Sequence, residues 1–135
     1  MTTTTNQKKG KTFEQEWVDY LYSQGMWVHY IQPAPDGSQP FDVIAVKDGV
    51  VYAFDCKTLK GKRFPLNRIE DNQQTAFESL NKQGVHNTYF VIKTEDNFAH
   101  VVPSQRAIHL KMAGVKSIDV TRMEYACIYI KQDND

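Results

Sequence analysis

The chain has 135 residues, of which 41% are hydrophobic, and this size and composition fit one folded domain. Its 16 Lys and Arg equal its 16 Asp and Glu, so the overall charge does not mark it as a nucleic-acid binder. No apolar stretch approaches the roughly 18 residues of a membrane-spanning helix, and the two cysteines form no zinc-binding pattern. We expect a cytoplasmic protein with Cys56 and Cys127 reduced in its core.

The predicted elements alternate between helices and strands. Residues 1–10 are Thr-rich and then basic, and we expect a disordered basic tail there, which leaves residues 11–135 as a single domain. Apolar residues at helical spacing predict a helix over 12–24, and three prolines and a glycine predict a loop over 32–40. The other predicted elements are a strand at 26–31, a strand hairpin at 41–57, a basic loop at 58–66, a helix at 68–83 capped by Asn67, strands at 86–93 and 98–102, a short helix at 105–113, and extended segments at 117–120 and 124–130, the last at a sheet edge. This order predicts an α/β sandwich around a mixed central sheet.

The hairpin carries the clearest signal in the chain. Asp48-Gly49 lies between two apolar, β-prone runs, which is the pattern of a two-residue type I′ turn. That turn sets the strand register, and counting back from it places Asp42 opposite Asp55. Opposed side chains project to the same side of a sheet with Cβ atoms about 4.5–5.5 Å apart. Strand alternation puts Lys57 on that side as well, so two carboxylates and an ammonium are predicted to meet on one face.

The opposed aspartates need something to offset their repulsion. A divalent cation such as Mg²⁺ is the simplest candidate, with Asp42 and Asp55 supplying carboxylate oxygens and Cys56 its backbone carbonyl. Lys57 would then orient or deprotonate a water molecule, or stabilise charge on a phosphate in transit. The alternative is that both aspartates are solvated at strand ends or cap a turn.

Two helical positions could add polar groups to this site. On a helical wheel Glu14 lies roughly 50° from the centre of the apolar stripe of the first helix, and Glu16 roughly 110°. We therefore expect Glu14 to point toward the sheet as a third carboxylate and Glu16 to point toward water. In the second long helix Gln73 falls in the middle of the apolar stripe, so it is either a satisfied structural glutamine or a group that reaches the site.

Basic residues follow the hairpin without an intervening acid. They are expected to contact backbone phosphates and to position a duplex without reading its sequence, although a solvated loop would also account for the charges. The candidates for DNA binding are Lys60, Lys62, Arg63 and Arg68, with Lys11 in a second basic patch near the N-terminus.

Together these residues resemble the PD-(D/E)xK nuclease superfamily. The superfamily pattern is matched by Pro40-Phe41-Asp42, by Asp55-Cys56-Lys57 and by a helical glutamate upstream. The segment 10–14 is similar to the opening of RecU-type Holliday-junction resolvases, and the segment 54–66 followed by Gln73 is similar to that family's active-site strand, basic loop and following helix. The archaeal resolvases share the same Glu, Asp and acid-x-Lys layout.

The resemblance implies a restriction-endonuclease-like core and an endonuclease, dependent on Mg²⁺ or Mn²⁺, that cuts branched DNA. It implies a homodimer, because two symmetric nicks need two sites. It makes Glu14, Asp42 and Asp55 the metal ligands, lets Lys57 serve the attacking water, and gives Gln73 a supporting role. This chain departs from the pattern in having Asp55 where these families usually have Glu, and a short loop, residues 32–40, where the RecU type has a stalk.

Three hypotheses therefore stand. The first is a dimeric junction resolvase, and the second is a nuclease of the same fold that acts on forks, ends or a restriction target. The third is a DNA-binding module whose acidic residues are structural.

Overall fold

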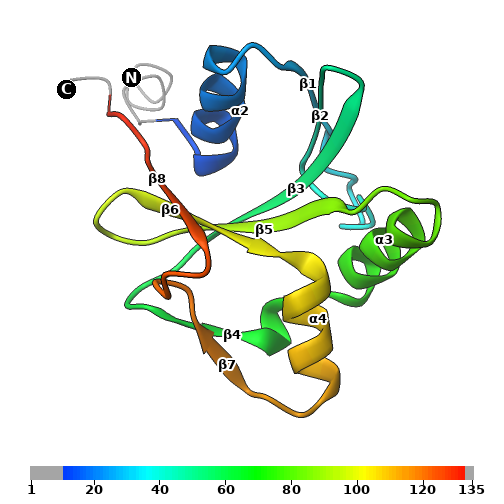
Figure 1. The fold of residues 1–135 in the computed structure, drawn as a ribbon, viewed down its shortest axis with the longest axis vertical. Helices are drawn as coiled ribbons and strands as arrows, with labels where there is room; N and C mark the ends of the chain where they lie inside the picture. Colours follow the sequence, from blue (N-terminus) through cyan, green and yellow to red (C-terminus); the bar gives the residue numbers. More distant parts are fainter. Residues whose placement is uncertain (1–10, 133–135) are drawn as a thin grey trace.

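Residues 11–132 are described in the computed structural model of the chain (Figure 1). The tail predicted for residues 1–10 lies outside this range. The elements are α2 (Phe13–Ser23), β1 (Trp27–Tyr30), β2 (Val43–Lys47), β3 (Val50–Thr58), β4 (Arg63–Pro65), the 3-10 helix η1 (Leu66–Arg68), α3 (Asp71–Lys82), β5 (Asn87–Lys93), β6 (Phe98–Pro103), α4 (Ser104–Met112), β7 (Ser117–Asp119) and β8 (Ala126–Tyr129). Apart from β4 and η1, the predicted order of helices and strands is confirmed.

The main sheet is mixed, as predicted, with the strand order β1-β2-β3-β5-β6-β8. Within it β3 and β5 run parallel, and the other neighbouring strands run antiparallel. A parallel pair requires a crossover connection, which η1 and α3 provide between these two strands. The last strand, β8, lies at the sheet edge where it was expected.

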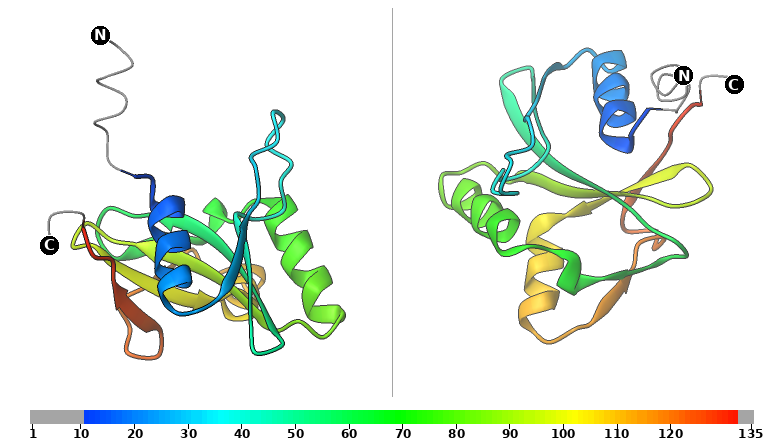
Figure 2. Two further views of the ribbon diagram at one scale, coloured as in Figure 1. Left: turned by 90° about the horizontal axis from the view of Figure 1, so that it is seen from above. Right: turned by 180° about the vertical axis from the view of Figure 1, so that it is seen from behind.

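Helices cover both faces of the sheet (Figures 1 and 2). On one face α2 packs through Trp17 onto a cluster that contains Phe54 and Cys56. On the other face Phe77 of α3 belongs to a cluster with Ala53. Alternation along β3 therefore directs Phe54 and Cys56 toward α2, and directs the side chain of Asp55 toward α3.

The N-terminus of α3 differs from the prediction. The helix begins at Asp71 with Glu70 as its N-cap, whereas we expected Asn67 to cap it. Residues 66–68 instead form η1, whose Leu66 is buried and donates its N–H to the carbonyl of Lys116. This contact with a residue far along the chain keeps the segment out of the α-helix, and local sequence does not reveal it.

The basic loop is also more regular than predicted. Residues 63–65 form β4, which pairs antiparallel with β7 in a separate two-stranded sheet. Phe64 is fully buried in the cluster on the α3 side. The pairing partner lies more than fifty residues away, so the strand could not be inferred from the loop itself.

Cys127 corrects a second expectation. Both cysteines are free thiols, but only Cys56 is buried, and Cys127 is exposed. On the edge strand β8, Ile128 and Ile130 turn toward the α2-side cluster. Cys127 precedes Ile128 in this strand, so alternation turns its thiol to the opposite face.

Within residues 11–132, no helix is both long enough and apolar enough to cross a bilayer.

Candidate active site at the ends of strands β2 and β3

The tight turn and the register predicted for the hairpin are confirmed. Asp48 and Gly49 have φ angles of 51° and 78°, as a type I′ turn requires at both central residues. From this turn the pairing proceeds without a bulge to Val43 opposite Phe54. The pairing ends there, and the N–H of Asp42 donates to the carbonyl of Phe54, so the predicted pairing of Asp42 with Asp55 is not part of the ladder. The two carboxyl groups are nevertheless near each other, since Asp42 acts on the pKa of Asp55.

Asp55 is deeply buried, with 2% of its surface exposed. Its Oδ1 accepts a hydrogen bond of 3.2 Å from Nε2 of Gln73. Its Oδ2 lies 3.1 Å from Nζ of Lys57, whose side chain is only 10% exposed. The ammonium is not aligned for a hydrogen bond, and no other described residue donates one, so Oδ2 remains a buried acceptor without a hydrogen bond.

Asp42 approaches the same position from β2. Its Oδ2 accepts a hydrogen bond of 2.7 Å from the backbone N–H of Cys56. The half-buried carboxylate is thereby tied to the backbone between Asp55 and Lys57. The acid-x-Lys segment of β3 and the aspartate that precedes β2 therefore form one compact group.

The electrostatics of this group favour a bound positive charge. Burial raises the pKa of Asp55 to about 7, against the lowering effect of Lys57 and with a further increase from Asp42. Burial and the charge of Glu14 also raise the pKa of Asp42, although the Cys56 N–H opposes them. Without a metal ion, the carboxyl group of Asp55 therefore keeps its proton up to near neutral pH. This proton avoids the repulsion that two ionised carboxylates would have.

Glu14 contributes to this electrostatic field from the first turn of α2, where it is half-buried. Its charge acts on Asp42, so the two carboxylates are neighbours. Among residues 11–132, however, no three His, Cys, Asp or Glu side chains are gathered closely enough to hold a metal ion. The structure thus brings Asp42 and Asp55 together and leaves Glu14 beside them.

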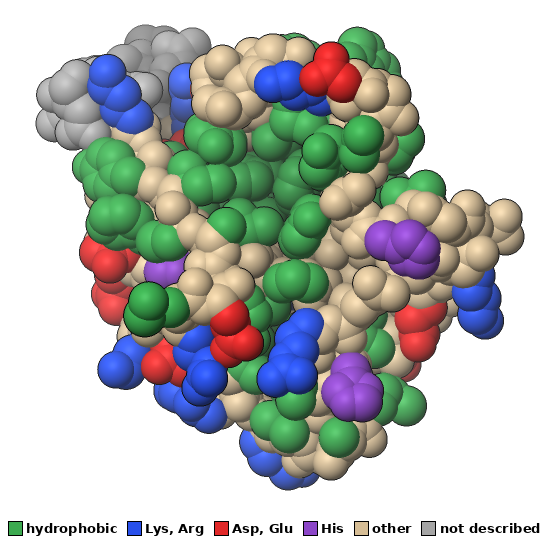
Figure 3. All heavy atoms as spheres, viewed as in Figure 1, with side chains coloured by type: hydrophobic (Ala, Val, Ile, Leu, Met, Phe, Trp, Pro, Cys, Tyr) green, Lys and Arg blue, Asp and Glu red, His purple; other side chains and the backbone are tan. Residues whose placement is uncertain are grey.

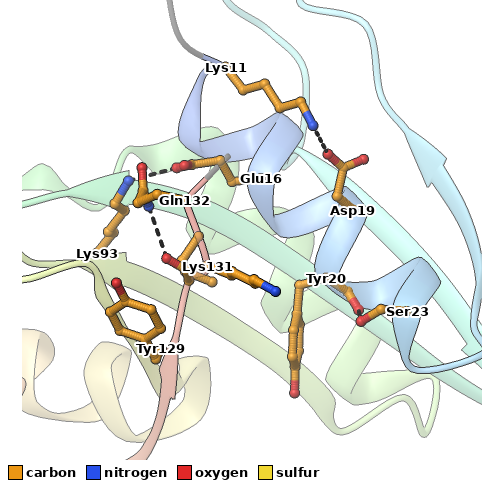
Figure 4. Close-up of a pocket in the computed structure, with 10 residues that line it drawn as sticks. Lys11, Glu16, Asp19, Tyr20, Ser23, Lys93, Tyr129, Lys131 and Gln132 are labelled. Carbon is orange, nitrogen blue, oxygen red and sulfur yellow. Dashed lines mark hydrogen bonds and ion pairs between the residues drawn. The ribbon is translucent and has the colours of Figure 1, made fainter. Parts of the chain in front are cut away.

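The expectation that Glu16 points toward water is wrong. Its side chain is 12% exposed, and its Oε1 lies 2.6 Å from Nζ of Lys93 at the end of β5. The ammonium of Lys93 also lies 5.8 Å from the ring centroid of Phe13. The ion pair borders a cavity of about 560 Å³ between α2 and the end of β8 (Figure 4). A helical wheel cannot anticipate this partner, because β5 meets α2 only in the folded chain.

Gln73 combines the two roles that the sequence left open. Its Nε2 donates to Asp55, and its Oε1 accepts a hydrogen bond of 3.1 Å from the N–H of Glu70. The side chain therefore closes the capping box of α3 and orients the buried carboxylate at the same time.

Three comparisons with known proteins point to one family. A family model described as archaeal Holliday junction resolvase (Hjc) matches residues 5–126. The chain belongs to this family. Holliday junction resolvase RecU of Mycoplasmopsis pulmonis is 26% identical over 90 residues, a match that covers 67% of this chain and 55% of that protein. The chain thus spans about half the length of this curated relative.

The fold agrees with a solved structure of the family. Hjc of Archaeoglobus fulgidus, a Holliday junction resolvase from an archaeal hyperthermophile, superimposes with a TM-score of 0.55. The two chains are 18% identical, and the match covers 69% of this chain and 75% of the other. The restriction-endonuclease-like core expected from the sequence is the fold of this family.

The predicted DNA-binding residues of this resolvase-family chain are all exposed, but two of them are tied to the fold by hydrogen bonds. Arg63 donates to both the hydroxyl and the carbonyl of Ser117, which ties β4 to β7. Arg68 donates to the carbonyl of Thr58 and lies 5.3 Å from the ring centroid of Phe64. Lys60 and Lys62 are exposed, and Lys11 pairs with Asp19 at 2.6 Å.

Lys60, Arg68 and Lys93 nevertheless share one surface. They line a cavity of about 470 Å³ between the basic loop and the turn that joins β5 to β6. Because Thr58 pairs with Lys93, this cavity begins one residue beyond Lys57. Sequence reasoning missed Lys93, for which the only available signal was a lysine at the end of an apolar strand.

Proposed function

We propose that this chain is a metal-dependent, structure-selective DNA endonuclease that resolves four-way junctions by paired nicks. One observation carries the proposal. Asp42, Asp55 and Lys57 are held together at adjoining strand ends, and a buried carboxylate oxygen there lacks a hydrogen bond. A structural role for the acids would leave that oxygen unexplained, because buried acceptors are normally satisfied. Membership of a resolvase family supports the same conclusion.

The residues present fit a hard divalent cation. Asp42 and Asp55 offer oxygen ligands, the Cys56 carbonyl follows Asp55 on β3, and Glu14 lies beside the pair without completing a three-carboxylate cluster among the described residues. We propose that these residues bind Mg²⁺ or Mn²⁺. Such an ion, when bound, neutralises the carboxylates, acidifies water and stabilises negative charge on a phosphate.

The protein's own groups would then position the reactants. Lys57 is held by its ion pair with Asp55, so its ammonium is fixed where it can orient the attacking water and stabilise charge on the scissile phosphate. Gln73 fixes the rotamer of Asp55 through one hydrogen bond and leaves the other oxygen available. The exposed Lys60 and Lys62, with Arg68, would contact backbone phosphates next to the site.

A homodimer is part of the proposal, because two symmetric incisions need two sites. An uncovered apolar surface supports it. On the face seen in Figure 3, hydrophobic side chains gather in a hollow over the sheet between α2 and the β2–β3 hairpin. On the α2 side of the sheet, Tyr52, Tyr89 and Val101 are only half-buried. Surfaces of this kind commonly mark protein–protein contacts.

The proposal is tested by cleavage of a labelled four-way junction with Mg²⁺, with Mn²⁺ and with no metal. We expect paired nicks with either ion and none without, and a loss of about 100-fold or more in Asp55→Ala. Glu78→Gln is the matched control, because Glu78 is exposed on α3, more than one helical turn beyond Gln73.

Linear duplex of the same sequence separates the remaining hypotheses. Equal cutting of duplex and junction would favour a nuclease of this fold that acts on other DNA. If the wild-type protein binds both substrates and cuts neither with any metal, only the hypothesis of a DNA-binding module remains.

A further inference from the structure

Two stretches of the sequence that contain no acidic residue meet in one region of the fold. Residues 56–69 and 97–118 hold half of the 16 Lys and Arg of the chain and none of its 16 Asp and Glu. Strand β4 of the first stretch pairs with β7, which begins in the second, and the N–H of Leu66 donates to the carbonyl of Lys116. Figure 1 shows β4, α4 and β7 together below the main sheet. A chain without net charge therefore carries one basic region.

A cavity of about 420 Å³ lies where these two stretches join. Its walls come from the end of β4 and from η1 on one side, and from the end of α4 and the start of β7 on the other. The short helix η1 separates it from the cavity of about 470 Å³ beside the active site, since Leu66 and Asn67 line the first cavity and Arg68 lines the second. Three residues of 3-10 helix span only about 6 Å. One strand of DNA backbone can therefore reach both cavities.

Lys111 lines this cavity without a negatively charged partner. Its side chain is half-buried, and its ammonium donates to the carbonyl of Ile69 at 3.2 Å and to Oε1 of Gln74 at 2.9 Å. Both acceptors are neutral, and no carboxylate within residues 11–132 forms an ion pair with Lys111. An ammonium has three protons to donate. The fold therefore fixes the position of this charge and leaves one proton for an anionic ligand.

Lys116 and Arg63 add exposed positive charge at the same place. Lys116 lines the cavity, and Arg63 donates only to the hydroxyl and carbonyl oxygens of Ser117, which also lines it. In the described part of the chain, neither residue forms an ion pair with a carboxylate. Asp119, which ends β7, accepts hydrogen bonds from the N–H and the hydroxyl of Thr121. The positive charges around the cavity are thus left for a ligand.

We infer that this cavity binds a backbone phosphate of a duplex arm of the DNA, and that Lys111 and Lys116 contact that phosphate. The inference rests on the proposed function, because DNA is the polyanion that the neighbouring site would hold. A phosphate oxygen accepts from several donors at once, which suits two ammonium groups on one cavity wall. Contacts on both sides of η1 would position the DNA relative to the carboxylates without reading its sequence.

The test is Lys116→Gln, which removes one charge and keeps the backbone carbonyl that bonds to Leu66. Lys82→Gln is the matched control, because Lys82 is also exposed and ends α3 at the opposite end from Gln73. Binding of a fluorescent four-way junction is measured by anisotropy in EDTA and in Ca²⁺, over a range of salt concentrations. Cleavage with Mg²⁺ is measured at limiting and at saturating DNA.

We expect Lys116→Gln to reduce the slope of log affinity against log salt concentration by about 1, and to weaken binding by about three- to tenfold at about 0.1 M salt. The loss should be the same in EDTA and in Ca²⁺, because a phosphate contact outside the carboxylate site needs no metal ion. Cleavage at saturating DNA should keep the wild-type rate. Lys82→Gln should match wild type throughout.

Lys111→Gln should reduce the salt slope in the same way. Because Lys111 also ties α4 to the segment before α3, its melting temperature is measured alongside. If this variant is destabilised, the result with the exposed Lys116 decides.

An unchanged salt slope in Lys116→Gln, with wild type cutting the junction, would overturn the inference and leave the proposed function intact. An equal loss in Lys82→Gln would also overturn it, since the effect would then belong to the total charge of the chain. The proposed function fails separately, if wild type cuts no DNA with Mg²⁺ or Mn²⁺.

Discussion

At the scale of single residues, the site holds two carboxyl groups close enough to repel each other when both are ionised. Asp55 is buried with an unsatisfied oxygen, and Asp42 is held near it by a backbone N–H. An arrangement of this kind costs stability in the isolated protein and is retained where the charge has a function. The cost can be measured, because it depends on pH.

Asp55→Asn should stabilise the metal-free protein strongly at pH 8 and clearly less at pH 5. The pKa of Asp55 is raised to about 7 in the folded state, against about 3.9 for an unfolded aspartate. The folded protein therefore gains stability from the bound proton at low pH and loses it as the pH rises through 7. A shift of this size corresponds to at most about 4 kcal/mol, a net figure that already includes the ion pair with Lys57.

Melting temperatures in EDTA between pH 5 and pH 8 check this prediction, with Glu78→Gln as the exposed control. A gain in stability that is the same at both ends of the range would show that ionisation of Asp55 is not its source.

At the scale of elements, each helix and strand end supplies one part of the site. The type I′ turn fixes which residues of β2 and β3 face each other, and the first turn of α2 carries Glu14, whose charge acts on Asp42. The crossover helix α3 then lays Gln73 over Asp55. These relations were partly predictable: hairpin register and helical periodicity are local, and together they brought Asp42, Asp55 and Gln73 to one site.

Gln73→Leu should damage both the helix and the site. The leucine fits the apolar stripe of α3, but it removes the capping bond to Glu70 and leaves Oδ1 of Asp55 without its donor. We expect a loss of about 1–3 kcal/mol in unfolding free energy and a 10- to 100-fold loss of junction cleavage. Urea unfolding and the cleavage assay measure the two effects.

Gln74→Leu is the control, because Gln74 contacts Lys111 and Met112 on α4 and not the site. If Gln74→Leu reduced cleavage as strongly as Gln73→Leu, the effect would belong to helix packing.

At the scale of the whole molecule, one chain supplies one carboxylate pair, and resolution of a junction needs two. We expect a solution mass of twice the 15.6 kDa of the chain at micromolar concentration. Light scattering coupled to size exclusion measures it. A mass of one chain at every concentration, together with paired nicks, would require that dimers form only on DNA.

The loop over residues 32–40 also belongs to this scale. It extends away from the sheet (Figure 2, left) and is anchored by Asn72, which donates to the carbonyls of Gly37 and Gln39. Sequence indicated a loop from its prolines and glycine, but its anchor to α3 depends on a contact across more than thirty residues. The same limit explains the errors at Asn67, at residues 63–65, at Cys127 and at Glu16, since each depends on a partner distant in the chain.

The amino-acid sequence by itself determined what depends on neighbours along the chain. Turn chemistry at Asp48-Gly49 set the strand register, alternation put Lys57 with the aspartates, and helical spacing turned Gln73 inward. Tertiary structure alone decided the rest. It joined Lys93 to Glu16 and buried Asp55 deeply enough to raise its pKa. Burial and long-range pairing arise only when distant segments pack together, and no local pattern encodes them.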